Sequence, residues 1–234
     1  IIEDASHAIG ASYDEIKVGS CVHSDITVFS FHPVKIITTA EGGMAVTNKK
    51  VLFEKMSLLR THGITKDLTS MKENSDGPWY YEQIDLGFNY RMTDIQAALG
   101  SSQLSRLGDF IKKRHLIANE YNKAFADLPI TLPWQDPNSY SSFHLYVIRI
   151  NKDFYNHKKV FIDLRERGIG INLHYIPVYR HPFYTKFGFD KNDFPESEAY
   201  YAEAISLPIY SKLSSADQTF VIKNLKESLS LNLK

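Results

Sequence analysis

The chain of 234 residues is long enough for one large domain or for one and a half smaller ones. Lysine plus arginine and aspartate plus glutamate both number 27, so the zero formal net charge argues against binding of nucleic acid or anionic membranes through bulk charge. The single cysteine, Cys21, excludes an intrachain disulfide framework and is typical of a packed residue in a reducing cytoplasm, and no stretch approaches the roughly 18 apolar residues of a membrane span.

The first hundred residues alternate short apolar runs with polar connections, which predicts strands joined by turns and helices. The polar stretch 68–79 contains Gly77-Pro78 and is therefore expected to be a loop. Thr93 is expected to cap a helix that begins just after it. Strands are predicted at Ile1–Ile2, Ile26–Phe31 and Met44–Thr47, and a helix at Val51–Arg60.

The second half of the chain begins with a long amphipathic pattern. Its apolar residues fall near helical spacing, which predicts one helix over about 102–128, and three prolines between 129 and 137 then break the pattern. The residues after these prolines are typical of a small α+β unit, with Gly168 as a helix C-cap and Ser214 as a helix N-cap. Strands are predicted at Phe143–Ile150 and Ile171–Val178, and helices at Val160–Arg167, after Pro195 and after Ser214.

Lys35 is the first candidate for chemistry, because it comes after a strand and the turn Ser30-Phe31-His32-Pro33. A lysine at a strand end can project into a cleft, where desolvation allows its amine to lose the proton near neutral pH and to attack a carbonyl carbon. Taken alone, a lysine here is more often a solvated surface charge, and it is the surrounding string that favours a chemical role.

Asp4 and His7 lie in the segment Ile2-Glu3-Asp4-Ala5-Ser6-His7-Ala8-Ile9-Gly10. An acid at the end of a buried strand, with small residues and a glycine after it, is a plausible cleft wall. The residues alone leave Asp4 open as a turn or helix-capping residue and His7 as a structural histidine. His7, His23, His32 and His62 show no short metal-ligand spacing, so no metal site is expected.

These segments together resemble the DegT/DnrJ/EryC1/StrS family of sugar aminotransferases, a branch of the type I fold of pyridoxal-phosphate enzymes. The resemblance extends over essentially the whole chain and includes the features of the subgroup that acts in the pseudaminic-acid pathway. The strings that carry it are Glu3-Asp4-Ala5-Ser6-His7-Ala8, Phe29 to Lys35, Glu41-Gly42-Gly43-Met44, His62-Gly63, Trp79-Tyr80-Tyr81, Leu86-Gly87-Phe88-Asn89-Tyr90-Arg91, Asn172 to Val178 and Ile205-Ser206-Leu207-Pro208.

The resemblance implies an α/β fold and a pyridoxal 5'-phosphate cofactor. Lys35 would hold the cofactor as a Schiff base and then move the proton between substrate and cofactor. Asp4 would pair with the pyridine nitrogen, and His7 would sit against the ring or its phenolic oxygen. Ser30 would donate its hydroxyl to the phosphate. Asn89 would reach the phosphate bound by a second copy of the chain, which implies a homodimer with shared active sites.

The resemblance further implies a nucleotide-sugar substrate and an amino-acid donor, glutamate. Arg91, His174, Tyr175 and Tyr184 are the candidates for binding the nucleotide sugar, and a guanidinium can meet a diphosphate with two parallel hydrogen bonds. Each of the four is equally compatible with a packing or solvent-facing role. The segment 178–184 departs from the usual sequence of the subgroup, which affects the substrate rather than the cofactor chemistry.

The expected function is transfer of an amino group from glutamate to C4 of a UDP-4-keto-6-deoxy-N-acetylhexosamine in a bacterial cytoplasm. Two alternatives remain, namely a sibling transaminase of another nucleotide 4-keto sugar and a non-catalytic relative that binds the cofactor or a sugar nucleotide. The family branch that uses the cofactor for dehydration has histidine in place of the lysine, so Lys35 argues for a transaminase.

The chain opens on Ile1-Ile2, which indicates a strand already under way, and chains of the family begin earlier by on the order of 150 residues. We therefore expect a fragment. Residues 1–125 would be the C-terminal part of the large cofactor-binding domain, and residues 126–234 the small C-terminal α+β domain. Parallel strands are normally covered on both faces, so the fragment by itself is expected to be poorly soluble or inactive.

Overall fold

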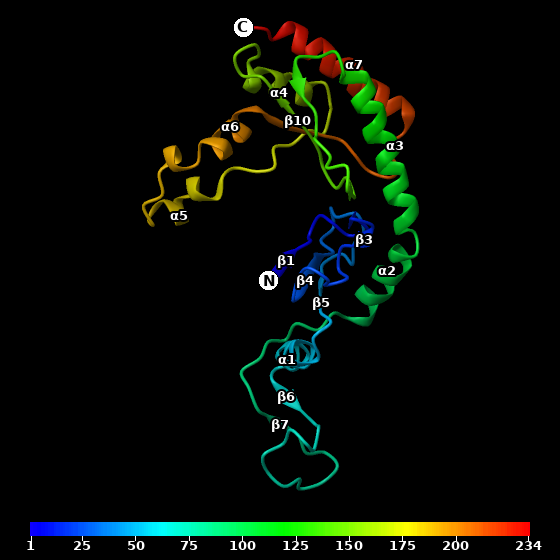
Figure 1. Ribbon diagram of the computed structural model, residues 1–234, viewed down its shortest axis with the longest axis vertical. Helices are drawn as coiled ribbons and strands as arrows, with labels where there is room; N and C mark the ends of the chain where they lie inside the picture. The colour runs from blue at the N-terminus through cyan, green and yellow to red at the C-terminus, as the bar shows by residue number, and fades with distance from the viewer. The chain divides into compact units, whose positions relative to one another are not determined.

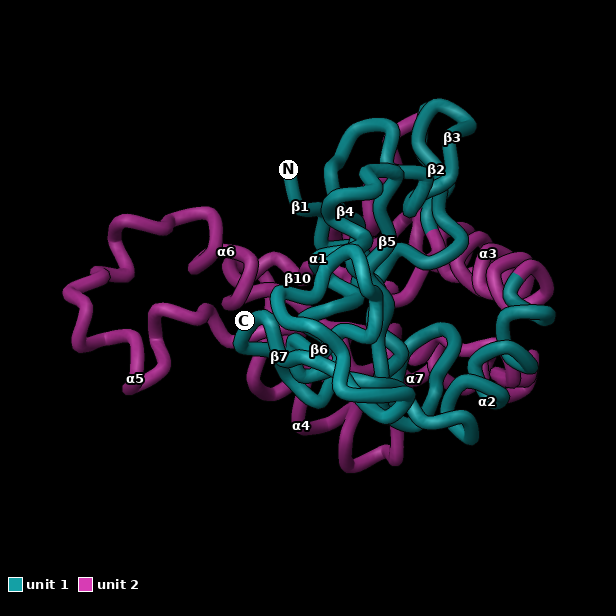
Figure 2. Tube along the Cα trace, turned by 90° about the horizontal axis from the view of Figure 1, so that it is seen from below, with its two compact units in different colours: residues 1–107, 138–141 teal, residues 108–137, 142–234 magenta.

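The computed structural model describes all residues from Ile1 to Lys234 and divides into two compact units (Figure 2). Unit 1 comprises residues 1–107 together with 138–141, and unit 2 comprises residues 108–137 and 142–234. The assignment of a large cofactor domain to 1–125 and a small domain to 126–234 stays a prediction. No helix has the length and apolarity that a crossing of the membrane requires.

A three-stranded sheet in the order β1-β4-β5 organises unit 1 (Figure 1). β1 and β4 are parallel, with Asp4 opposite Val28, whereas β4 and β5 are antiparallel, with Ser30 opposite Gly43. Because parallel strands end at the same edge of a sheet, Asp4 and Ser30 both lie at this edge. The strands span Ile2–Asp4 (β1), Ile26–Ser30 (β4) and Gly43–Val46 (β5).

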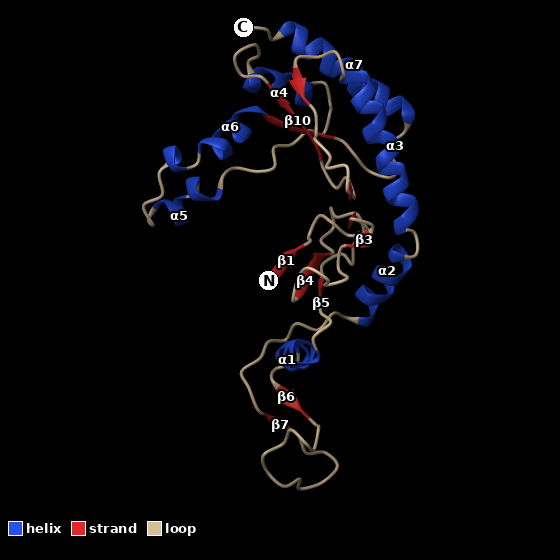
Figure 3. Cartoon of the chain, in the orientation of Figure 1, coloured by secondary structure: helices blue, strands red, loops and turns tan.

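The remainder of unit 1 consists of short strands and two helices. The predicted cap is confirmed, because the Thr93 hydroxyl accepts from the backbone of Gln96 and the Gln96 side chain accepts from the backbone of Thr93. A long loop joins β6 to β7 and contains neither helix nor strand, as predicted (Figure 3). The elements are β2 (Ser12–Tyr13), β3 (Ile16–Lys17), β9 (Ser139–Tyr140), α1 (Lys50–Arg60), β6 (Ile64–Thr65), β7 (Glu82–Gln83) and α2 (Asp94–Leu104).

Unit 2 is built on an antiparallel sheet in the order β11-β10-β8. Strand β11 is buried along its whole length, and β10 alternates buried and half-buried residues. The elements are α3 (Leu107–Phe125), β8 (Ile130–Thr131), β10 (Tyr146–Ile150), α4 (His157–Glu166), η1 (Val178–Arg180), α5 (Pro182–Thr185), η2 (Lys191–Asp193), α6 (Pro195–Glu203), β11 (Ala204–Leu207) and α7 (Ser215–Leu231). The Ser214 cap is confirmed, since its hydroxyl accepts from the backbone of Asp217.

The core of unit 2 contains buried tyrosine and arginine side chains whose polar atoms form hydrogen bonds with the backbone or with other side chains. The Tyr121 hydroxyl donates to the carbonyl of Pro208 at 2.9 Å, and the Tyr146 hydroxyl donates to the Asn122 side chain at 2.6 Å. The guanidinium of Arg114 donates to three backbone carbonyls. Burial lowers the pKa of Arg114 to about 10, because a cation loses hydration there.

Two predicted elements are wrong. The single helix expected over 102–128 is divided, because α2 ends at Leu104 and α3 begins at Leu107. The side chain of Ser105, between them, bonds back to the carbonyl of Ser102 and competes with the helical pattern. The strand expected at Ile171–Val178 is reduced to one isolated bridge between Asn172 and Ser206, and the short 3-10 helix η1 comes after it.

Candidate active site

Asp4 is the last residue of β1, and Ser6 fixes its carboxylate. The backbone N–H and the hydroxyl of Ser6 both donate to Oδ1 of Asp4, at 3.0 and 2.5 Å. These two bonds, the hydroxyl first, lower the pKa of Asp4, and the charges of His7 and Lys35 lower it further. The structure thus brings His7 and Lys35 within electrostatic reach of Asp4.

Lys35 is half-buried within the connection between β4 and β5, residues 31–42. Desolvation lowers its pKa below the ordinary value for lysine, and the negative charge of Asp4 raises it in part. Its backbone N–H donates to the carbonyl oxygen of His32 at 2.9 Å, while the next residues, Ile36 and Ile37, are buried and anchor the turn. The Lys35 amine is therefore carried by a hydrogen-bonded stretch of backbone and lies within electrostatic reach of the Asp4 carboxylate.

Two glycines at the end of the connection between β4 and β5 leave no room for a Cβ atom. Gly42 has a φ of +157°, and a Cβ there would lie 2.2 Å from the hydroxyl of Thr39. A Cβ at Gly43 would lie 2.8 Å from the carbonyl oxygen of Phe29, with which its strand is paired. The string Glu41-Gly42-Gly43 therefore returns the chain to the sheet, where Gly43 begins β5 opposite Ser30.

Ser30 lies at the end of β4, at the same sheet edge as Asp4. It is half-buried, and its hydroxyl accepts weakly from the backbone N–H of His32 at 3.4 Å. Because the hydroxyl is the acceptor in this bond, its proton remains available for donation to an anion.

Asn89 and Arg91 occupy an exposed turn that is held by two glycine segments. Gly63 has a φ of +69°, and a Cβ there would meet the carbonyl of Asp85 at 2.0 Å; a Cβ at Gly87 would meet the backbone nitrogen of Gly63 at 2.2 Å. The Arg91 guanidinium donates to the Asn89 amide oxygen at 3.1 Å. The segments that contain Gly63 and Gly87 thus pack backbone against backbone, and this packing leaves Asn89 and Arg91 exposed on the turn.

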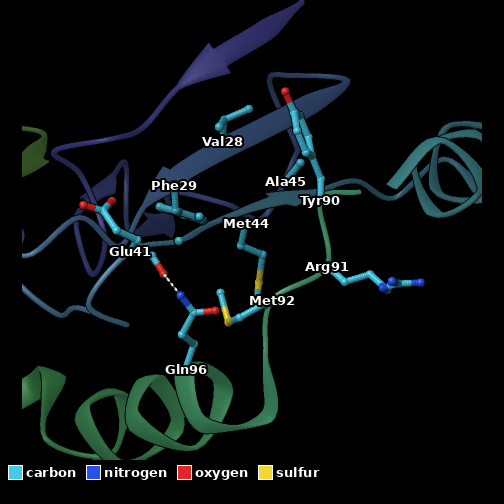
Figure 4. A pocket seen from close by; sticks show the side chains of 11 residues that line it. Val28, Phe29, Glu41, Met44, Ala45, Tyr90, Arg91, Met92 and Gln96 are labelled. Atoms are coloured by element: carbon cyan, nitrogen blue, oxygen red, sulfur yellow. Dashed lines mark hydrogen bonds between the residues drawn. The ribbon is translucent and has the colours of Figure 1, made fainter. Parts of the chain in front are cut away.

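A hollow lies between β4, β5 and the start of α2 (Figure 4). The side-chain amide of Gln96 donates to the carbonyl of Glu41 at 3.0 Å, and this bond links α2 to the connection between β4 and β5 that contains Lys35. Arg91 lines the rim, but its side chain points away from the hollow in Figure 4. Arg91 is therefore available to a ligand outside this hollow rather than inside it.

His174, Tyr175 and Tyr184 belong to unit 2, whereas the other predicted site residues belong to unit 1. The His174 ring is held by a 2.8 Å hydrogen bond between its Nδ1 and the hydroxyl of Ser206, and the backbone carbonyl of His174 accepts from the Tyr200 hydroxyl. Tyr175 and Tyr184 are exposed, at 61% and 39%. His174 and Tyr175 lie on the irregular segment that replaces the predicted strand, whereas Tyr184 lies in the short helix α5.

Sequence reasoning missed Ser6 and Ser206 as partners of site residues. The spacing Asp-x-Ser is a signal for Ser6, because an aspartate commonly accepts from the backbone two residues later. Ser206 carried no such signal, since its bond to His174 joins positions 32 residues apart.

The sequence that builds this site matches a known protein family over nearly its whole length. The profile of the DegT/DnrJ/EryC1/StrS aminotransferase family matches residues 1–226. The chain belongs to this family. The matched range contains the segments of Asp4, Lys35 and Asn89.

Three relatives show the extent of the match in this aminotransferase family. The UDP-4-amino-4,6-dideoxy-N-acetyl-beta-L-altrosamine transaminase of Campylobacter jejuni is 39% identical over 94% of the chain and 56% of its own length. The structure of Spr1654 from Streptococcus pneumoniae, a putative sugar aminotransferase in its PMP form, has a TM-score of 0.90 at 31% identity, over 99% of the chain and 59% of its own. Helicobacter pylori PseC, an aminotransferase involved in the biosynthesis of pseudoaminic acid, has a TM-score of 0.89 at 34% identity, over 98% and 59%.

The chain thus spans less than two thirds of the length of these relatives. The predicted family and fold class are confirmed. The predicted cofactor is confirmed at the level of the family, because the Streptococcus pneumoniae protein is solved in PLP and PMP forms.

The residues of this chain fit pyridoxal phosphate by the chemistry of their donor groups. The cofactor requires an amine that can lose its proton, a carboxylate for the ring nitrogen and a hydroxyl donor for the phosphate. Lys35, Asp4 and Ser30 are groups of these three kinds, and the first two interact electrostatically.

Proposed function

We propose that this chain carries the catalytic lysine of a pyridoxal-phosphate-dependent aminotransferase that acts on a nucleotide sugar. Glutamate and a UDP-4-keto-6-deoxy-N-acetylhexosamine would exchange an amino group for a keto oxygen, giving 2-oxoglutarate and the 4-amino sugar. The observation that carries the proposal is the half-buried Lys35, whose pKa is lowered by desolvation, beside the ionised Asp4. The names of the Campylobacter and Helicobacter relatives support the pseudaminic-acid pathway.

The cofactor, when bound, supplies an aldehyde that takes up the amino group and a ring that accepts electrons from the substrate carbon. Asp4 would keep the ring nitrogen protonated, because a carboxylate with a lowered pKa stays anionic at neutral pH. His7 would contact the ring or its phenolic oxygen. Ser30 would donate its hydroxyl to the phosphate.

Lys35 has two tasks in the proposal. Its amine would hold the cofactor aldehyde and, once released by the amino substrate, would move the proton between the substrate carbon and the cofactor carbon. Both tasks need the neutral amine, so the desolvation that lowers the pKa of Lys35 serves each of them. The charge of Asp4 opposes this effect and limits how far the pKa falls.

Five further residues would contact the substrate or a second copy of the chain. Asn89 would complete the phosphate site of a second copy in a homodimer, and its exposed turn is compatible with that contact. Arg91 would meet the diphosphate, because its guanidinium is exposed and points away from the hollow. His174, Tyr175 and Tyr184 would contact the sugar or the base. We infer a cytoplasmic site of action from the single cysteine.

The test uses the protein that carries this chain, loaded with cofactor and reduced with borohydride. Mass spectrometry of peptides should find the cofactor attached to Lys35, and the Lys35→Ala variant should lose both this attachment and transamination. Lys158→Ala removes an exposed lysine of α4 and serves as the matched control. Attachment at another lysine, or unchanged transamination in Lys35→Ala, would refute the role of Lys35.

A panel of nucleotide 4-keto sugars then identifies the substrate. We expect turnover with the UDP-linked N-acetylhexosamine and glutamate, with formation of 2-oxoglutarate. Turnover of a dTDP- or GDP-linked sugar instead would show a sibling transaminase. Cofactor or sugar-nucleotide binding without any turnover would show a non-catalytic binding protein.

A further inference from the structure

Ser6 makes two hydrogen bonds to the same oxygen of Asp4. Its backbone N–H and its hydroxyl donate to Oδ1, at 3.0 and 2.5 Å, and no bond to Oδ2 accompanies them. An oxygen that accepts two donors is poorly placed to accept a third, so Oδ1 is fixed and Oδ2 is the oxygen that a ligand would meet. The carboxylate is exposed, so a ligand can approach it.

We propose that Ser6 is a positioning residue that directs Oδ2 of Asp4 to the cofactor ring nitrogen and keeps the shared proton on that nitrogen. This inference rests on the proposed function, in which Asp4 pairs with the ring. The proton between Asp4 and the ring nitrogen has two locations, one giving an ion pair and the other a neutral acid beside a neutral ring. A donor to Oδ1 stabilises the carboxylate anion and therefore favours the ion pair.

The surroundings of Asp4 support this role for Ser6. The hydroxyl of Ser6 is the largest cause of the lowered pKa of Asp4, ahead of its backbone N–H and of the charges of His7 and Lys35. When Lys35 is joined to the cofactor its amine no longer carries the same free charge. The Ser6 hydroxyl then becomes a still larger part of what holds Asp4 as an anion.

The experiment measures the ring nitrogen directly. The protein that carries this chain is loaded with cofactor labelled with ¹⁵N in the ring, and the ¹⁵N chemical shift reports how far that nitrogen is protonated. Ser6→Ala keeps the backbone donor and loses only the hydroxyl. We expect the proton equilibrium to shift about tenfold toward Asp4, the size of one charge-assisted hydrogen bond, with a matching fall in kcat and little change in KM.

Ser6→Thr, which retains a hydroxyl, should restore the ¹⁵N shift and kcat. Ser24→Ala is the matched control, because the Ser24 hydroxyl donates to the neighbouring Glu3 rather than to Asp4 and its loss should leave the shift unchanged. An unchanged shift in Ser6→Ala, with a changed shift in Asp4→Asn, would overturn the role of Ser6 alone. An unchanged shift in Asp4→Asn would instead remove Asp4 from the ring, and with it that part of the proposed function.

Discussion

Replacing Gly87 with alanine should loosen the turn that carries Asn89 and Arg91. A Cβ at Gly87 would lie 2.2 Å from the backbone nitrogen of Gly63, 2.5 Å from the carbonyl carbon of His62 and 2.7 Å from the carbonyl oxygen of Leu59. All three are backbone atoms, which cannot rotate away as a side chain can. We therefore expect the upper range of overpacking costs, about 2–3 kcal/mol of local stability.

Amide hydrogen exchange reports this loss where it occurs. The backbone N–H of Phe88 donates to the carbonyl oxygen of Leu59 at 2.7 Å, and that of Tyr90 donates to the carbonyl oxygen of Arg60 at 3.0 Å. A loss of about 2–3 kcal/mol corresponds to roughly 30- to 150-fold faster exchange at these two amides if they exchange through local opening.

Gly108→Ala is the matched control for this prediction, because a Cβ there meets nothing within 4 Å and the residue lies in helix α3. It should stabilise its helix by up to about 1 kcal/mol. Exchange at Phe88 and Tyr90 that stays within about threefold of wild type in Gly87→Ala would refute the reasoning, since the predicted clash would then have been absorbed without cost. Gly63→Ala with Gly87→Ala should cost less than the two single changes together, because both separate the same two segments.

Three further predictions concern stability and titration. Leu225→Ala, at a fully buried position, should cost about 2–5 kcal/mol, measured by urea unfolding. Thr93→Ala should cost about 1 kcal/mol by removing the cap of α2, whereas Thr93→Ser should not, measured in the same way. In cofactor-free protein, the lowered pKa should make Lys35 react with acetic anhydride at a lower pH than exposed lysines do. The Asp4→Asn variant should lower the pH at which this reaction begins still further, because the charge of Asp4 raises the pKa of Lys35. Mass spectrometry measures the acetylation, and a reaction of Lys35 that begins at the same pH as that of Lys158 would contradict the expected effect of burial.

The local parts of the fold were predictable because their causes are local. Thr93 and Ser214 cap helices through residues three positions later, and the strand at Ile26–Ser30 is explained by its β-branched and aromatic residues. The break between α2 and α3 also has a local signal, since Ser105 lies in it and serine has only moderate helix propensity. The break was not predicted because the helical spacing of apolar residues continues across it.

The candidate site was predictable in composition but less so in geometry. The segments with Asp4 and Lys35 indicated the kind of chemistry from their residue types, while the proximity of the two residues depends on the parallel pairing of β1 with β4. The segment 171–178 has the composition of a strand, yet it pairs only at Asn172. His174 instead bonds through its side chain to Ser206, and this contact between distant residues overrides the local preference.

Strand β9 gives unit 1 a particular order of assembly. The chain leaves unit 1 after residue 107 and returns for residues 138–141, where Ser139–Tyr140 pairs with β2. When synthesis has reached only residue 107, one edge of β2 is uncovered, and such an edge can pair with another chain. The sheet is finished only after the whole of α3 has been synthesised, so nascent chains are most exposed to misassembly during that interval.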